Sequence, residues 1–210
     1  MQGVKRGLFS NEAGEGSAPN AAAIATTSHP VKQGLLQALG VFTDTLVICS
    51  CTAFIILISG IYENGSDGII LTTQALESEI GIAGRWFITA AIFLFAYSTI
   101  IANYFYGETN IRFVTSHNNR QQRMYIFLFR LITGITILAG AYMTLQTAFT
   151  IVDIVMGLMT ITNLLAILLL FPKVRILLED YKSQLRAGKN PRFSKQIFDA
   201  DTQRDIISWD

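Results

Sequence analysis

Three polar side chains lie on one uncharged stretch of the chain, in a pattern suited to holding a small cation or a polar solute. Residues 86–107 contain no charge, but their second half carries Ser98, Thr99 and Asn103. At positions i, i+1 and i+5 of a helix, these side chains can present oxygen atoms toward one sector of a helix bundle. A helix of this length rises about 33 Å, which is enough to cross the hydrocarbon of a bilayer. Because polar side chains in a membrane cost free energy unless something uses them, the pattern indicates a pathway for a desolvated cation or small polar solute.

The composition is typical of an integral membrane protein with several spans. Charged residues make up 15% of the chain and apolar residues 51%, whereas about a quarter of a soluble domain is charged. The net charge of +1 gives no argument for a nucleic-acid partner. Four segments are long and apolar enough to span the membrane, at about 36–62, 86–107, 125–147 and 149–171. The last two follow each other directly within 125–171.

The positions of the charges predict how the chain crosses the membrane. The 63–85 loop holds four acidic residues against Arg85, whereas the 108–124 loop holds three arginines. The tail, 172–210, holds eight lysines or arginines and reads as an amphipathic helix followed by a polar end. The positive-inside rule therefore places the 108–124 loop and the C-terminal tail in the cytoplasm and the 63–85 loop outside.

The outer loop is long enough to hold structure of its own. Thr72 or Thr73 could cap a short helix lying along the outer surface, and this helix could act as a lid. A plain connection is the alternative, although a loop of this length is uncommon.

The first 34 residues predict the end of a broken helix and a cytoplasmic connection. Glycines and a proline interrupt residues 7–19, so a continuous regular helix there would be costly. Pro19, preceded by Ser17, is a usual way to start a helix, and the small residues that follow favour a short half-helix ending before His29. A long polar loop is the alternative; against it, a half-helix of small residues packs closely beside another helix, as membrane interfaces favour.

Two carboxylates within the apolar segments leave alternatives open. A carboxylate at the membrane centre costs roughly 2.5–3.5 kcal/mol, so it is tolerated mainly beside a partner or a cavity. Asp44 either has such a role or is a helix-end carboxylate bonded to its neighbours. Asp153 either pairs with a basic group across an outer vestibule or lies in the interface. Asn163 lies past the middle of the fourth span, and Arg130, one turn inside the third, is interpreted as snorkelling to the cytoplasmic surface.

The sequence gives no indication of a metal centre or a catalytic constellation. Cys49 and Cys51 lie two positions apart and point away from each other on a helix, so neither a disulfide nor a thiolate metal site is expected. His29 and His117 lie far apart in loops. We therefore expect no resident metal, no cofactor and no enzyme activity.

Five motifs, in order and spacing, resemble those of the prokaryotic sodium-coupled alanine or glycine symporters. They are RGLFSNEAGEGSAP (6–19), HPVKQGL (29–35), GVFTDT (40–45), FAYSTIIANYFYGETN (95–110) and DYKSQLRAGKNPRF (180–193). The resemblance implies an all-α integral membrane fold, namely the C-terminal half of a leucine-transporter-like inverted-repeat bundle. That half comprises about four full transmembrane helices plus a broken half-helix at the N-terminus. Glu15 stands where such proteins usually have an apolar residue, and Ala102 where many have glycine.

The resemblance also implies which residues bind. In that fold, substrate and ion lie near the middle of the membrane, where two helices are broken and their backbone groups face a ligand. The implied cation site is formed by Ser98 and Thr99, whose hydroxyl oxygens are hard ligands of the kind sodium prefers. The implied substrate-binding residues are Asn11, Gly14, Gly16, Ser17, Thr99 and Asn103.

The expected function is secondary active transport, in which sodium entry is coupled to uptake of a small neutral amino acid such as alanine or glycine by alternating access. Sodium is then cargo rather than cofactor, and the partners are the amino acid, the ion, the lipid bilayer and the N-terminal half that such proteins carry. The alternative is a truncated, non-transporting membrane fragment or an accessory membrane protein. The sequence does not distinguish alanine from glycine or serine, nor sodium from protons.

Overall fold

The computed structural model describes residues 3, 7, 9–12, 14–65, 68–115 and 119–206. Arg6, Leu8 and Ala13 of the first motif, and His117, lie outside the described residues. The chain divides into two compact units, one formed by Met1–Val41 with Thr144–Asp210 and the other by Phe42–Met143. Each unit is described by itself.

The described residues form helices and connections and contain no strand, which confirms the predicted all-α class. Four helical stretches are long and apolar enough to cross a membrane: Pro30–Ser59, Ile82–Val114, Asn119–Tyr142 and Leu145–Arg186. Most large apolar side chains on these helices are exposed; among the described residues, the buried apolar ones are Ala75, Ile126 and Phe198. This apolar surface is therefore available to lipid and to other helices.

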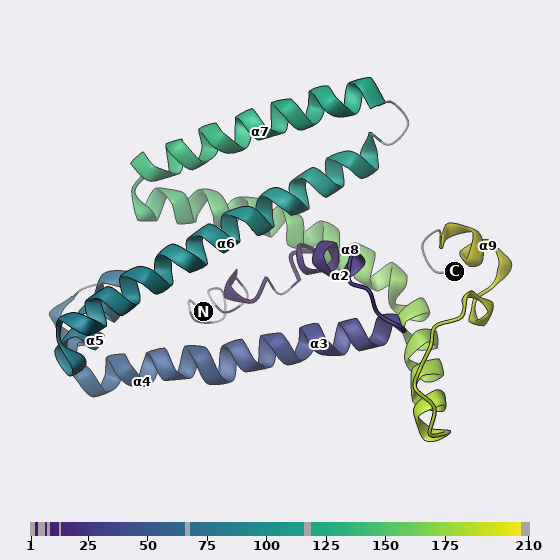
Figure 1. Cartoon of the computed structure of the whole chain (residues 1–210), viewed down its shortest axis with the longest axis horizontal. Helices are drawn as coiled ribbons and strands as arrows, with labels where there is room; N and C mark the ends of the chain where they lie inside the picture. The colour runs from purple at the N-terminus through teal and green to yellow at the C-terminus, as the bar shows by residue number, and fades with distance from the viewer. Residues whose placement is uncertain are drawn as a thin grey trace. The chain divides into compact units, whose positions relative to one another are not determined.

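The first unit is built around α8 (Leu145–Arg186), with α2 (Ala18–Ala23), most of α3 (Pro30–Thr43), η3 (Lys195–Ile197) and α9 (Ala200–Asp205). The predicted fourth span and the amphipathic part of the predicted tail are one continuous helix, although Pro172 lies inside it. Proline removes one backbone hydrogen bond and bends a helix without always ending it, and the axis of α8 changes direction in its C-terminal part (Figure 1).

The chain after α8 returns along the end of that helix. Gly188 has a φ of 69°, the left-handed conformation that commonly ends helices, and the amide of Lys189 donates to the carbonyl of Gln184. The following segment then runs back beside α8 (Figure 1). Near its end, a hydrogen bond with Thr202, and to a smaller extent Lys173 of α8, lowers the pKa of the Asp199 carboxyl.

The second unit contains η1 (Asp44–Cys49), α4 (Ser50–Ser59), η2 (Ile61–Asn64), α5 (Gly68–Ile80), α6 (Ile82–Val114) and α7 (Asn119–Tyr142). Helices α6 and α7 run side by side in opposite directions (Figure 1). Each extends beyond its apolar segment toward the connection between them, to Val114 in α6 and from Asn119 in α7. In α6 the ion pair Glu108–Arg112 stabilises this extension.

The 63–85 loop contains a longer helix than its threonines suggest. Thr72 and Thr73 do not cap α5, since their hydroxyls donate to the carbonyls of Gly68 and Ile69 one turn earlier. Helix α5 packs against α4 and α6, and only Gly81, with a φ of 70°, separates it from α6. At this turn a Cβ on Gly84 would lie 2.6 Å from the carbonyl oxygen of Leu76, so the two helices approach closely only because residue 84 is glycine.

We predict that Gly84→Ala destabilises the protein. Alanine in a helix is favoured over glycine by about 1 kcal/mol, but overpacking against a backbone carbonyl costs about 1–3 kcal/mol or more. The variant should therefore lower the melting temperature of the purified complete native protein in detergent by several degrees. Gly134→Ala is the control, because a Cβ there meets nothing within 4 Å among the described residues. Equal melting temperatures for the two variants would contradict the close approach of α5 and α6.

Candidate functional site

The first part of the candidate site is an unwound stretch, residues 11–17, between a helical turn and α2. Its described residues form turns and bends, and three have positive φ: Glu12 at 49°, Gly14 at 84° and Gly16 at 88°. Glycine adopts this conformation at no steric cost, whereas Glu12 is strained in it. Strained backbone persists where surrounding contacts hold it, and it clusters at binding sites.

Side chains of the stretch bond to the preceding helical turn and to one another. Asn11 donates to the carbonyl of Gly7 from its backbone amide (3.2 Å) and its side-chain amide (3.0 Å). The hydroxyl of Ser17, a residue that is 9% exposed, donates to the Glu12 carboxylate at 2.6 Å. Ser17 therefore precedes α2 but does not cap it, and Pro19 lies in the first turn of this six-residue helix.

Helix α8 contacts the unwound stretch and holds it in place. The side-chain amide of Asn163 donates to the carbonyl of Gly14 at 3.0 Å. A Cβ on Gly16 would lie 3.1 Å from the amide carbon and oxygen of Asn163, so both the backbone conformation and this contact require glycine there. The rings of Phe9 and Phe149 add an edge-to-face contact with a centroid distance of 6.1 Å.

Two residues of this region gain a significance that sequence reasoning missed. In the sequence, Asn163 is a polar residue in an apolar span, and this is the signal that could mark it as a partner of broken backbone. Glu15 has one carboxylate oxygen, Oε1, that is buried and has no hydrogen-bond partner among the described residues. A buried acceptor of this kind favours a donor supplied by a ligand or by further protein.

The second part of the candidate site lies on α6, in the other unit. Ser98 and Thr99 are exposed, and the Ser98 hydroxyl donates to the carbonyl of Phe95 at 3.0 Å. Asn103 lines a cavity of about 300 Å³ between α6 and α7, where Thr133 and Thr136 also lie. Because residues 11–17 belong to the first unit and these residues to the second, their meeting at one site stays a prediction.

The two lone carboxylates lie in different settings. Asp44 is half-buried and begins η1, a π-helical stretch; such stretches are frequent at functional sites. The Cys49 thiol lies 3.9 Å from its carboxylate. Asp153 is half-buried within α8. A binding role for either residue stays a prediction.

Arg130 has partners on the neighbouring helix, and its snorkelling to the membrane surface stays a prediction. Its guanidinium donates to the hydroxyl of Tyr104 at 2.8 Å and lies 3.3 Å from the carboxylate of Glu108, whose side chain is only 12% exposed. Tyr104 and Arg112 also bond to Glu108. The cluster therefore joins α6 to α7, and an arginine that looks isolated in sequence has a partner on the neighbouring helix.

No group of three or more histidine, cysteine or acidic side chains within the described ranges could hold a metal ion. The arrangement offers hydroxyl, amide and backbone groups instead, which suit binding rather than bond-breaking chemistry. Together with four membrane-length helices, these features define a multi-pass membrane protein with a broken, glycine-rich segment.

The sodium:alanine symporter family model matches residues 1–195, and the chain therefore belongs to this family. It is 52% identical over 198 residues to the probable sodium/glutamine symporter GlnT of Bacillus subtilis, a match that covers 94% of this chain. It is 44% identical to the amino-acid carrier protein AlsT of the same organism over 91% of this chain. It is 36% identical to the sodium/proton-dependent alanine carrier protein of Bacillus sp. (strain PS3) over 92% of this chain.

The matches cover 40%, 40% and 46% of these relatives, so the chain spans less than half of their length. These relatives are named as symporters or carriers, which supports the expectation that the protein is not an enzyme. No solved structure gives a significant match.

We predict that Asn163→Ala loosens residues 9–20. Loss of the donor leaves the Gly14 carbonyl without this partner, at a cost of about 1–3 kcal/mol. Hydrogen exchange of residues 9–20, measured by mass spectrometry on the complete native protein, should therefore become faster. The control is Thr162→Ala, because the Thr162 hydroxyl donates to carbonyls of its own helix, those of Leu158 and Met159. Equal exchange in both variants would refute the role of Asn163.

Proposed function

We propose that the chain forms part of a secondary transporter that couples entry of a cation to uptake of a small neutral amino acid. The observation that carries the proposal is the unwound stretch at residues 11–17, held against α8 by Asn163. Irregular backbone at membrane depth is tolerated where it is buried in protein or lines a cavity. In secondary transporters, such interruptions supply the polar groups that bind substrate.

The substrate would bind where Asn11, Gly14, Gly16 and Ser17 of the first unit meet Thr99 and Asn103 of the second. The left-handed glycines allow the backbone to approach a small ligand closely, because no Cβ stands in the way. The relatives are named for glutamine and for alanine, which favours a small neutral amino acid and leaves alanine, glycine and glutamine as the compounds to test.

The cation would bind at Ser98 and Thr99. Since the Ser98 hydroxyl donates its proton to the carbonyl of Phe95, its lone pairs remain available to a cation. Sodium is proposed as the driving ion, and protons are the alternative because one relative is named sodium/proton-dependent. Coupling arises when ion and amino acid both bind one of two alternating-access states more tightly.

The proposed setting is the plasma (inner) membrane, with the C-terminus in the cytoplasm. The support is the distribution of charge: acidic residues dominate the 63–85 loop, and basic residues dominate the connection between α6 and α7 and the tail.

Uptake into proteoliposomes tests the proposal. Labelled alanine, glycine and glutamine are offered to the complete native protein with a sodium gradient, a proton gradient or neither, and in parallel to this 210-residue chain alone. Gradient-driven uptake of at least one amino acid by the complete protein supports the proposal. Absence of uptake under every gradient would overturn it in favour of a non-transporting membrane protein.

We predict that Ser98→Ala combined with Thr99→Ala abolishes sodium-driven uptake, because both hydroxyl ligands of the cation are lost. The measurement is initial uptake rate against sodium concentration. Thr89→Ala is the matched control, since the Thr89 hydroxyl also donates to a carbonyl of α6 but lies outside the proposed site. Normal uptake with unchanged sodium dependence in the double variant would remove the cation assignment.

A further inference from the structure

The connection after α2 is fixed to the far end of α8 by a second set of contacts, here called the His29 junction. It consists of Ser28, His29 and Lys32 on one side and Asp180, Gln184 and residues 190–193 on the other. Its members come from the HPVKQGL and DYKSQLRAGKNPRF motifs, to which the proposed transport site assigns no role.

His29 is the centre of the junction. Its side chain is 0% exposed, and its ring lies against the rings of Tyr181 and Phe193 at centroid distances of 5.2 and 6.1 Å. Its Nδ1 accepts the backbone amide of Val31, so the ring proton lies on Nε2, which donates to the Asp180 carboxylate at 3.2 Å. One ring nitrogen thus accepts a hydrogen bond and the other donates one, which fixes the orientation of the ring.

The returning segment after α8 closes the junction. The carbonyl of Ser28 accepts the amide of Phe193 at 2.8 Å, and the Ser28 hydroxyl donates to the carbonyl of Pro191 at 3.0 Å. The side chain of Gln184 bonds both the amide and the carbonyl of Arg192, each at 2.9 Å, and also donates to Asp180. The ammonium of Lys32 reaches Asn190. The segment is therefore tied to α8 and to the connection after α2 at the same time.

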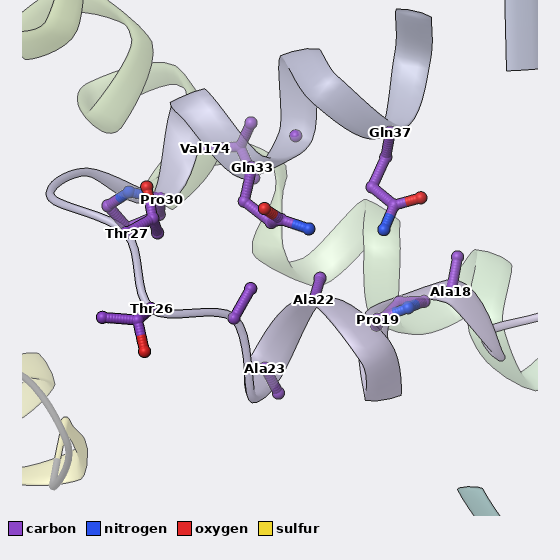
Figure 2. A pocket seen from close by; sticks show the side chains of 12 residues that line it. Ala18, Pro19, Ala22, Ala23, Thr26, Thr27, Pro30, Gln33, Gln37 and Val174 are labelled. Carbon is purple, nitrogen blue, oxygen red and sulfur yellow. The ribbon is translucent and has the colours of Figure 1, made fainter. Parts of the chain in front are cut away.

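The N-terminal part of the chain is consequently attached to α8 at two places. Asn163 holds the unwound stretch before α2, and Asp180, roughly 25 Å further along the helix at 1.5 Å per residue, holds the connection after it. Between these attachments, α2 makes no extensive contact with another helix among the described elements. A cavity of about 840 Å³ lies there, lined by residues of α2, α3 and Val174 of α8, and the side chains of Gln33 and Gln37 point into it across from Ala22 (Figure 2).

We propose that the His29 junction is a positioning device, which sets the place of α2 on α8 and thereby the geometry of the unwound stretch that precedes α2. The consequence for substrate affinity rests on the proposed function, whereas the placement of α2 does not. Because α2 is supported at its ends rather than along its length, loss of one support lets it move over the cavity. His29, Asp180 and Gln184 then act on the substrate through α2 and not by touching it.

The test compares Asp180→Ala and Gln184→Ala with Glu179→Ala, in the complete native protein with Cys49 and Cys51 replaced by serine. Glu179 is the matched control, since it is a carboxylate on the same turn but pairs with Arg175 at the surface of its own helix. His29→Gln is the conservative variant, because its amide can still donate to Asp180. The half-exposed Asp180 and Gln184 are used for the main variants because replacing the fully buried His29 by alanine risks unfolding the protein.

Two readouts separate the junction from the proposed function. The first is the rate of thiol labelling of a cysteine introduced by Ala22→Cys, which reports the position of α2 without requiring transport. We expect Asp180→Ala and Gln184→Ala to raise this rate about tenfold, His29→Gln less, and Glu179→Ala not at all. The second is the KM for labelled alanine and glutamine, expected to rise about tenfold in the same variants at unchanged protein abundance.

An unchanged labelling rate in Asp180→Ala and Gln184→Ala overturns the positioning of α2. A raised labelling rate with an unchanged KM overturns the link to substrate, and the junction then positions α2 without affecting substrate affinity. If no variant and no unmodified protein transports, the proposed function fails, and the labelling rates still decide whether the junction positions α2.

Discussion

The unwound stretch depends on one hydrogen bond, from the side-chain amide of Asn163 to the carbonyl of Gly14. A chain that leaves helical geometry inside a membrane must find other partners for its backbone groups, because lipid offers none. Here a polar residue of an apolar helix supplies one partner, and the absence of a Cβ at Gly16 allows the approach. The unwound stretch is therefore a defined structural element that α8 holds in place, which makes it suitable to present polar groups to a small ligand.

Few apolar side chains are buried within the described part of the chain. Within the described ranges, Ala75, Ile126 and Phe198 are the buried apolar residues, whereas long rows of leucine, isoleucine and phenylalanine are exposed on the four membrane-length helices. The contacts that join neighbouring elements are local, and each is polar or steric. They are the close turn at Gly84 between α5 and α6, the Glu108 cluster between α6 and α7, and the His29 junction at the end of α8. Such contacts position elements, while lipid and further helices supply the apolar environment.

The sequence predicted the elements better than their contacts. Hydropathy identified the four spans, and the glycines with Pro19 identified the interruption, because both properties are local. The spacing rules could not show that α8 continues through Pro172, since a proline bends or ends a helix depending on what lies beyond it. The sequence could not show the partner of Arg130, because Glu108 lies on another helix, and the pairing of His29 with Asp180 joins residues far apart in the chain. Neither pairing leaves a periodic signal in the sequence.

We propose that the unwound stretch and the hydroxyl-bearing part of α6 line one site. Crosslinking tests it most directly, with Ser17→Cys and Thr99→Cys in the complete native protein after Cys49 and Cys51 are replaced by serine. A short bifunctional methanethiosulfonate reagent should join the two cysteines, and sodium with the transported amino acid should slow the reaction, whereas Ser17→Cys with Thr89→Cys should not crosslink. Efficient labelling of both single cysteines without any crosslink between Ser17→Cys and Thr99→Cys would contradict the account.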